Sequence, residues 1–384
     1  MTPHEIDHTA PGSSDENQLS LVERYRLQTW FLGIIAFSMI LFFLVQARFI
    51  LISLVIAIIL FSLTADAITA FSRLRIGSWK VTNWLASMAA FTLIAVVLLT
   101  LSGIVIAQIN TVVTTTAAYT DQAITAIARL AAWISPEAQA TVEASIRSIE
   151  VSGYVSTLAG QASNLLSATT LVILFVGFMF AERLWFATKL ENLLHDRARA
   201  QRVGRIIHSI VRRVNHYLLV KTGVSLATGV SVYVMMLFFG LEFAAPMAIL
   251  TFVLNYLPSV GSIIATLLVS LVGYMQVTDP SFALLIFVIV GMIQFMLGSV
   301  IDPMLMGRAL RLSSFGIIVS LSFWGAVWGI AGMFLAVPIM VAIMIVCSHI
   351  PSARPVAVLL SREGLPDFED DEDLASTALR HAAE

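Results

Sequence analysis

The hydrophobic residues of this chain fall into long runs that are separated by polar stretches. Runs at 30–45, 49–63, 84–106 and 165–180 occupy the first half, and runs at 223–241 and 282–297 follow in the second. Hydrocarbon cannot hydrogen-bond exposed backbone, so an apolar run of about 20 residues in a membrane forms a spanning helix. The pattern predicts an all-α, polytopic helical membrane protein with about eight membrane segments.

Two further runs, 244–275 and 313–348, are too long for one ordinary span and contain breakers near their middles, at 255–261 and 324–332. Each half is roughly 14 to 17 residues, or about 21 to 25 Å of helix, which is shorter than a hydrocarbon core of roughly 30 Å. We therefore expect two re-entrant hairpins. The alternative is a single long, tilted helix at each place, which would give eight conventional spans.

The polar stretches divide the chain into seven regions. We expect a polar cytoplasmic tail (1–29), membrane helices 1–3 (30–110), an extracytoplasmic amphipathic helical segment (111–164), membrane helix 4 (165–182), a basic cytoplasmic amphipathic segment (183–221), a membrane transport core with both broken runs (222–349) and an acidic cytoplasmic tail (350–384). Within the extracytoplasmic segment, Ser135-Pro136 predicts the start of a helix, because proline is tolerated in the first turn.

Charge fixes the expected orientation. Basic residues gather in 183–221, which the positive-inside rule places in the cytoplasm. The two-hairpin topology also brings Arg308 and Arg311 to that side and leaves the acidic tail there. We therefore expect a multi-pass protein of a bacterial inner membrane with both termini in the cytoplasm. The arginines of the basic segment are expected to contact lipid headgroups, with a ligand site as the alternative.

Composition excludes several classes of protein. Hydrophobic residues make up 58% and charged residues 12% of 384 positions, unlike a soluble domain. The net charge of −2 gives no overall basic signal, so we expect no nucleic-acid partner. Cys347 is the one cysteine, so no intrachain disulfide can form. The phosphate-binding loop with its lysine, the HExxH site and the GxSxG elbow are absent from the sequence, and we expect no enzyme, cofactor or metal site.

Polar residues inside the runs need a reason, since a charged side chain at a helix centre costs roughly 2.5 to 3.5 kcal/mol on insertion. Asn255, Pro258 and Gly261 lie at the first expected hairpin tip. There proline lacks an amide donor and glycine permits positive φ, so backbone groups are free to meet a substrate; a tight turn without a ligand is the alternative. Gln294 offers one acceptor and two donors to a polar solute, or to a neighbouring helix.

Two acids are candidates for ion coupling. Asp302 precedes a proline at the end of the run that contains Gln294, where its carboxylate could bind a cation or carry a proton. Capping a chain reversal or pairing with Arg308 would also explain it. Asp66 lies near the inner end of the second run, where a membrane-edge role competes with coupling.

The second break contains Trp324, Trp328 and Gly329. Tryptophans four residues apart, next to glycines that let helices approach closely, favour tight packing. Stacking of a substrate on these rings is the alternative.

Three sequence blocks resemble the autoinducer-2 exporter family of bacterial membrane proteins, over about residues 30 to 350. The last is the most specific, because its tryptophans, glycines and terminal Ala-Val-Pro occur together. The blocks are Asn255-Tyr256-Leu257-Pro258-Ser259-Val260-Gly261, then Gln294 through Asp302-Pro303-Met304-Leu305-Met306-Gly307-Arg308, then Phe323-Trp324-Gly325-Ala326-Val327-Trp328-Gly329-Ile330-Ala331-Gly332-Met333-Phe334-Leu335-Ala336-Val337-Pro338.

The resemblance implies a secondary transporter. Some members are proposed to export the quorum-sensing signal autoinducer-2, and others are linked to sodium/proton exchange. It also implies a homo-oligomer, with a pentameric ring as one form. The family usually has an acid or amide three to five positions after the glutamine, where this chain has Leu297, Gly298 and Ser299. Ser262 and Ser314 stand where members often have proline.

We therefore expect a secondary transporter that exports a small solute such as autoinducer-2, with the two hairpin tips meeting near mid-membrane and framing the substrate together with Gln294. The second hypothesis is a monovalent cation (sodium)/proton antiporter that uses Asp302. The third is a non-transporting membrane scaffold that docks partners on 110–165 and 183–221. The expected partners are the lipid bilayer and a small-molecule or ion substrate.

Overall fold

The computed structural model describes residues 13–73, 83–132, 135–147, 151–258, 260–277, 279–306, 312–362 and 364. Within these ranges every regular element is a helix, and the one β-type pairing is an isolated bridge between Leu312 and Ser361. Eight of the described helices are long and apolar enough to cross a membrane. The predicted all-α membrane fold is confirmed.

The chain forms two compact units, Met1–Leu51 and Ile52–Glu384. The first unit contains α1 (Ser13–Gln46), which begins well before the apolar run, so the expected polar tail is helical from Ser13 onward. Large apolar side chains of α1, from Trp30 to Phe43, are exposed. Such exposure is expected of a helix that is surrounded by lipid.

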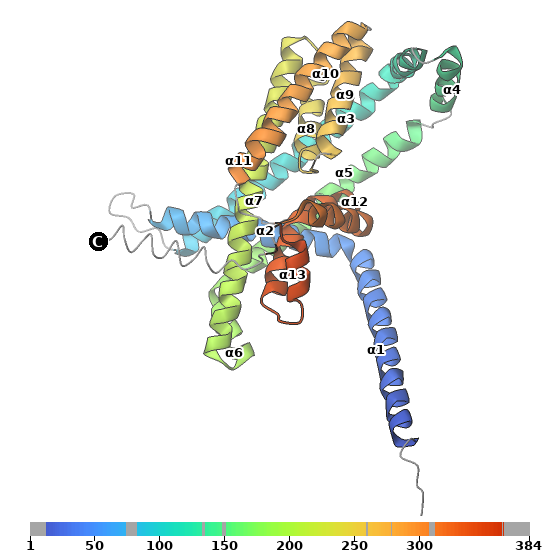
Figure 1. The fold of residues 1–384 in the computed structure, drawn as a ribbon. Coiled ribbons are helices and arrows are strands. Elements are labelled where there is room, and N and C mark those ends of the chain that lie inside the picture. The colour runs from blue at the N-terminus through green and yellow to red at the C-terminus, as the bar shows by residue number, and fades with distance from the viewer. Residues whose placement is uncertain are drawn as a thin grey trace, which may run out of the picture. The chain divides into compact units, whose positions relative to one another are not determined.

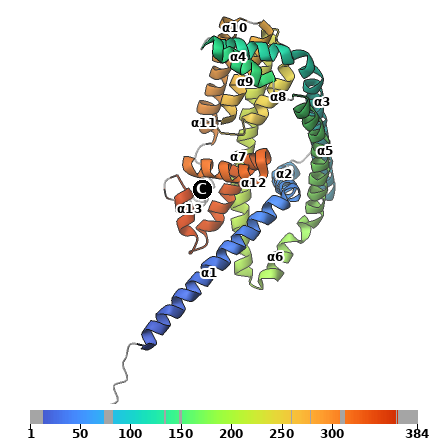
Figure 2. The ribbon, with the colours of Figure 1, turned by 90° about the vertical axis from the view of Figure 1, so that its right-hand side faces the viewer.

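The second unit begins within α2 (Arg48–Arg73) and continues with α3 (Asn83–Ala132), α4 (Pro136–Arg147) and α5 (Val151–Glu182). α4 begins at Pro136, as the sequence predicts. α3 and α5 pack along each other, and α4 lies at their far ends (Figures 1 and 2). A buried 2.8 Å hydrogen bond joins the hydroxyls of Ser102 and Thr169 across this pair.

A short 3-10 turn, η1 (Arg183–Trp185), and α6 (Phe186–Leu194) lead into α7 (Arg197–Phe238). Asp196 caps α7 by accepting hydrogen bonds from the backbone amides of Ala198 and Arg199. The 42 residues of α7 span roughly 60 Å, about twice a hydrocarbon core. The boundary expected at residue 222 falls inside this continuous helix.

The first broken run folds as two helices, α8 (Ala244–Leu254) and α9 (Val260–Val277), which pack against each other. A Cβ atom placed on Gly261 would lie 1.7 Å from the carbonyl oxygen of Leu254. Only glycine therefore lets the start of α9 approach the end of α8 this closely. The predicted break at 255–261 is confirmed.

The second broken run is α12 (Ser314–Ser348), which turns back on itself at Gly329 (φ 65°, ψ −142°). Its two arms lie side by side. A hydrogen bond joins them, in which the Ser320 hydroxyl donates to the Ala336 carbonyl oxygen at 2.8 Å. A Cβ atom on Gly332 would lie 1.9 Å from the Trp324 carbonyl oxygen. The predicted break is confirmed here too, whereas re-entry of either hairpin into a membrane stays a prediction.

Between the broken runs lie α10 (Pro280–Gln294), the π-helix η2 (Phe295–Ile301) and α11 (Asp302–Met306), and α13 (Arg354–Leu360) follows α12. Asp279 accepts a hydrogen bond from the Ser281 amide, and Pro280 occupies the first turn, so the start of α10 is well defined. The change from α- to π-helix after Gln294 was not predicted.

Two hydrophobic clusters form at different levels of α7. Val214 and Tyr217 of α7 pack with Val341 and Met344 of α12 and with their buried neighbours. About four turns further along, Val232 and Met236 form a second cluster with residues of α8, α9 and α10, including Val269, Ile286 and Val290. Figure 1 shows α8, α9 and α10 grouped beside one half of α7. The polar residues of α7 at Lys221 to Thr228 therefore lie between two packed regions of the helix.

Candidate functional site

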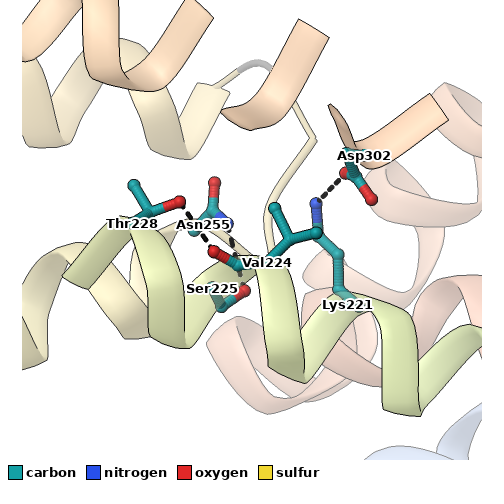
Figure 3. Close-up of polar contacts among 6 residues, drawn as sticks. All are labelled: Lys221, Val224, Ser225, Thr228, Asn255 and Asp302. Carbon is teal, nitrogen blue, oxygen red and sulfur yellow. Dashed lines mark hydrogen bonds and ion pairs between the residues drawn. The ribbon is translucent and has the colours of Figure 1, made fainter. Parts of the chain in front are cut away.

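A buried ion pair joins α7 to α11. Lys221 Nζ donates a hydrogen bond to Asp302 Oδ2 at 2.7 Å, and the two side chains are 7% and 14% exposed. Figure 3 shows the lysine reaching from α7 toward the carboxylate. Charges are buried at this depth only when they are paired, because an isolated ion loses its hydration without compensation. The pair therefore fixes the position of α11 against α7.

Lys221 was missed as a site residue because it was counted with the basic cytoplasmic segment. A signal was available in the sequence, since Leu218, Leu219 and Val220 precede it and the apolar run from residue 223 follows it. A lysine inside an apolar run needs a partner. The partner considered for Asp302 was Arg308, which lies outside the described residues.

The π-helix aligns Gln294, Gly298 and Asp302 on one face. In a regular α-helix, residues eight apart are offset by roughly 80° around the axis. The wider i→i+5 turns of η2 rotate the chain less per residue and reduce this offset. All three residues consequently line one cavity.

This first cavity has a volume of about 380 Å³. It lies between α7, the tip of the α8–α9 hairpin, η2 with α11, and both arms of α12. Among the described residues, its polar lining consists of Tyr217, Lys221, Asn255, Ser262, Gln294, Ser299 and Asp302, and its apolar lining includes Leu257, Pro258, Ile263, Ile317 and Val337. A mostly apolar cavity with a few convergent polar groups is typical of a small-molecule site.

Gln294 is the least satisfied polar side chain at this cavity. It is 5% exposed, and neither its amide nitrogen nor its amide oxygen meets a hydrogen-bond partner among the described residues. The second carboxylate oxygen of Asp302 is also buried without a partner in that part of the chain. A buried polar atom without a partner costs about 1 to 3 kcal/mol. Together these atoms offer one donor group and two acceptors to a ligand.

Asn255 attaches the hairpin tip to α7. Its side chain is 4% exposed, and its Nδ2 donates to Ser225 Oγ at 3.1 Å. One turn along α7, Thr228 Oγ1 donates to the Val224 carbonyl oxygen at 2.8 Å (Figure 3). Pro258 lines the first cavity, whereas Gly261 closes the hairpin and does not contribute to the lining.

The two breaks contact each other through Tyr256. Its ring stacks on Phe334 of the second α12 arm with centroids 4.8 Å apart. Its hydroxyl is 2.7 Å from the hydroxyl of Thr222 on α7. Tyr256 therefore contacts both the second broken helix and α7.

The remaining predicted residues lie elsewhere. Trp324 and Trp328 are buried with ring centroids 4.6 Å apart, and neither they nor Gly329 line the first cavity. Their geometry favours packing, and substrate stacking stays a prediction. The backbone of Asp66 belongs to α2, and its side chain is not among those that the structure describes. Within the described ranges, no three His, Cys, Asp or Glu residues gather where they could hold a metal ion.

Two broken helices that frame a buried, partly charged cavity in an all-helical membrane protein are typical of a membrane transporter. The chain belongs to the AI-2E family of transporters, whose sequence model matches residues 32–352. The resemblance seen in the three sequence blocks is thereby confirmed. The family consists of transporters, which agrees with the expectation that the chain is not an enzyme.

Relatives include the AI-2 transport protein TqsA of Escherichia coli K12, which is 31% identical over 61% of this chain and 63% of its own length. A provisionally named transport protein of Haemophilus influenzae is 31% identical over 57% of this chain and 62% of its own length. Another from Borreliella burgdorferi is 28% identical over 56% of this chain and 60% of its own length. The chain therefore spans less than two thirds of the length of these relatives.

Proposed function

We propose that this protein is a secondary transporter that exports a small polar solute through the first cavity. The observation that carries the proposal is the set of buried polar atoms without partners, on Gln294 and Asp302, beside the Lys221–Asp302 ion pair. A ligand that supplied their hydrogen bonds would remove an existing cost. TqsA is named as an AI-2 transport protein, and autoinducer-2 is accordingly the solute that we propose.

The cavity suits a small molecule that carries hydroxyl groups. Hydroxyls can donate to the amide oxygen of Gln294 and to Asp302 Oδ1, while the Gln294 amide nitrogen donates to an oxygen of the solute. The volume of about 380 Å³ lies within the range usual for small-ligand sites. Leu257, Pro258 and Ile263 supply an apolar wall for the rest of the molecule.

The ion pair provides a means of coupling. A proton or sodium ion that neutralised Asp302 would remove the attraction that holds Lys221, and α11 could then separate from α7. Because Tyr256 links α7 to both broken helices, this separation would reach the hairpins. Alternating access by movement of broken helices around a fixed site is the usual mechanism of such transporters.

The same pair favours a second candidate function, monovalent cation/proton antiport. Asp302 presents one oxygen to Lys221, and its other oxygen has no partner among the described residues, so a cation that entered the cavity could compete with the lysine. In this case ions alone would be exchanged, and Gln294 would be dispensable.

We further propose that both hairpins enter the membrane without crossing it, with the basic start of α7 in the cytoplasm of a bacterial cell. Arg197, Arg199, Arg202, Arg205 and Arg212 are exposed there, as expected for contact with lipid headgroups. A homo-oligomer is part of this proposal, because many apolar side chains of α9 and α10 face outward and could be covered by lipid or by a second copy.

The test is the flux of labelled autoinducer-2 in proteoliposomes that contain the purified protein, with and without an imposed proton or sodium gradient. We expect gradient-stimulated flux in the wild type, at least tenfold less flux in Gln294→Leu, and loss of coupling in Asp302→Asn. The matched controls are Gln201→Leu on the exposed face of α7 and Asp196→Asn, in which asparagine still caps α7. Both should transport normally.

Two results would decide against solute export. Pure cation/proton exchange that survives in Gln294→Leu and disappears in Asp302→Asn would establish the antiport function. If the wild type, correctly inserted, carried neither autoinducer-2 nor ions, the transport proposal itself would be wrong.

A further inference from the structure

A second, more open cavity of about 300 Å³ adjoins the first at the outer face of α9 and α10, where Leu267, Phe287 and Phe295 are exposed. Thr266, Leu267, Phe287, Gly291 and Phe295 line only this cavity. Four residues line both cavities, and the dividing wall is therefore made of their side chains; they are Ser262, Ile263, Gln294 and Ser299. Side chains in such a wall can change rotamer on fast timescales.

Gln294 is the central member of this wall. It is 95% buried and belongs to the lining of both cavities, and both of its amide atoms lack a partner among the described residues. The π-helix that begins directly after Gln294 loosens the regular backbone pattern at this position. An amide with this placement can bond a solute on one side of the wall and then on the other.

We propose that the second cavity is the next substrate site along the transport path, and that Gln294 transfers a small, uncharged, hydroxyl-bearing solute into it from the first cavity. This inference rests on the proposed function and specifies its route and substrate class. It assigns Gln294 as a substrate-binding residue of both sites.

The chemistry of the second cavity sets the substrate class. Among the described residues, no charged side chain lines it, and its polar groups are the hydroxyls of Ser262, Thr266 and Ser299 together with Gln294. Thr266 Oγ1 already donates to the Ser262 carbonyl oxygen at 2.8 Å, so its lone pairs are left to accept from a solute hydroxyl. An ion would lose its partners on leaving Lys221 and Asp302, whereas a neutral solute can exchange one set of hydrogen bonds for another.

Two glycines allow each cavity to be blocked separately. Gly298 lines only the first cavity and Gly291 only the second, and an added Cβ atom at either position meets no atom within 4 Å. The Cβ atom of a substituted residue at either place therefore enters open space. Gly223, on an exposed position of α7, has the same open surroundings but lines neither cavity, and Gly223→Leu is the matched control.

We expect flux of labelled autoinducer-2, an uncharged furanone, to fall at least tenfold in Gly291→Leu and in Gly298→Leu and to stay within twofold of wild type in Gly223→Leu. Gly291→Ala should transport nearly normally, because a methyl group leaves most of the space open. Labelled lactate, an anion of smaller size, should not be carried by the wild type.

The outcomes separate this inference from the proposed function. If Gly298→Leu blocks flux and Gly291→Leu does not, the second cavity is not on the path, while transport through the first remains supported. If neither leucine blocks flux, or if wild type carries no autoinducer-2, both proposals are overturned. Transport of lactate at a comparable rate would overturn the assignment of a neutral substrate.

A second variant protects the test against misfolding. Gly291→Cys in a Cys347→Ser background can be folded, reconstituted and only then modified with a bulky thiol reagent. We expect normal flux before modification and at least tenfold less afterwards, with no change in Gly223→Cys treated in the same way. Unchanged flux after complete modification at position 291 would overturn the inference.

Discussion

Replacing Lys221 with methionine should strongly destabilise the protein, even though methionine fills a similar volume. The substitution leaves the carboxylate of Asp302 buried without its cation. Because that side chain is only 14% exposed, water can compensate for little of the loss. The cause of the destabilisation is the charge that remains, not the packing that is lost.

The magnitude follows from the burial of the pair. Removing one partner of a buried ion pair typically costs about 3 to 5 kcal/mol. The first cavity admits some water to Asp302, so we expect the lower end, about 3 kcal/mol, or roughly a hundredfold in the ratio of folded to unfolded protein. Asp302→Leu should cost a similar amount. The double variant Lys221→Met/Asp302→Leu should regain most of the loss, because an apolar pair of similar volume replaces both charges.

The assay is a double-mutant cycle of unfolding free energies, measured by titration with a denaturing detergent in mixed micelles and followed by tryptophan fluorescence. Lys189→Met is the control, because Lys189 forms an ion pair with Glu182 in which the side chains are 63% and 54% exposed. A screened surface pair of this kind contributes less than about 1 kcal/mol. The reasoning is refuted if Lys221→Met is no less stable than Lys189→Met, or if the double variant is less stable than either single variant.

Three further predictions concern the breaks and the cavity. Gly261→Ala should destabilise the α8–α9 hairpin, whereas Gly160→Ala, with open space around it, should not; equal unfolding midpoints would contradict the close approach at Leu254. Gly329→Ala should cost about 1 to 3 kcal/mol because of its positive φ, measured in the same detergent titration. Gln294→Leu should abolish transport without loss of stability, because it removes a buried amide that has no partner in the described structure; a clear fall in the unfolding midpoint would show a structural role instead.

The sequence was sufficient to predict the breaks in the long apolar runs, because glycine and proline act locally. Pro258 marks a turn through its own backbone preference, Gly261 permits the close approach of α9 to α8 because it lacks a Cβ atom, and Gly329 takes a positive φ in α12. The same local logic predicted that a helix would begin at Pro136. By contrast, we expected α3 and α7 to end where the composition changes from apolar to polar, and both helices continue through that point. An α-helix satisfies its own backbone hydrogen bonds, so it can continue from lipid into water.

The site was predicted only in part, because its key pairing is long-range. Gln294 and Asp302 stood out as polar residues at apolar positions, and both line the first cavity. The partner of Asp302 lies 81 residues earlier in the chain, and nothing in local spacing connects the two. The π-helix was also beyond local reasoning, since the residues of η2 have no breaker pattern of their own apart from Gly298.

The central claim is that the first cavity opens alternately to the two sides of the membrane and holds the solute in between. The most direct test is labelling of Gly298→Cys, in a Cys347→Ser background, with a membrane-impermeant thiol reagent added to one side of the proteoliposome or to the other. The account predicts labelling from both sides, with the favoured side reversing when the gradient is reversed and both rates slowed by autoinducer-2. Labelling from one side only, whatever the gradient and whether or not the solute is present, would contradict it.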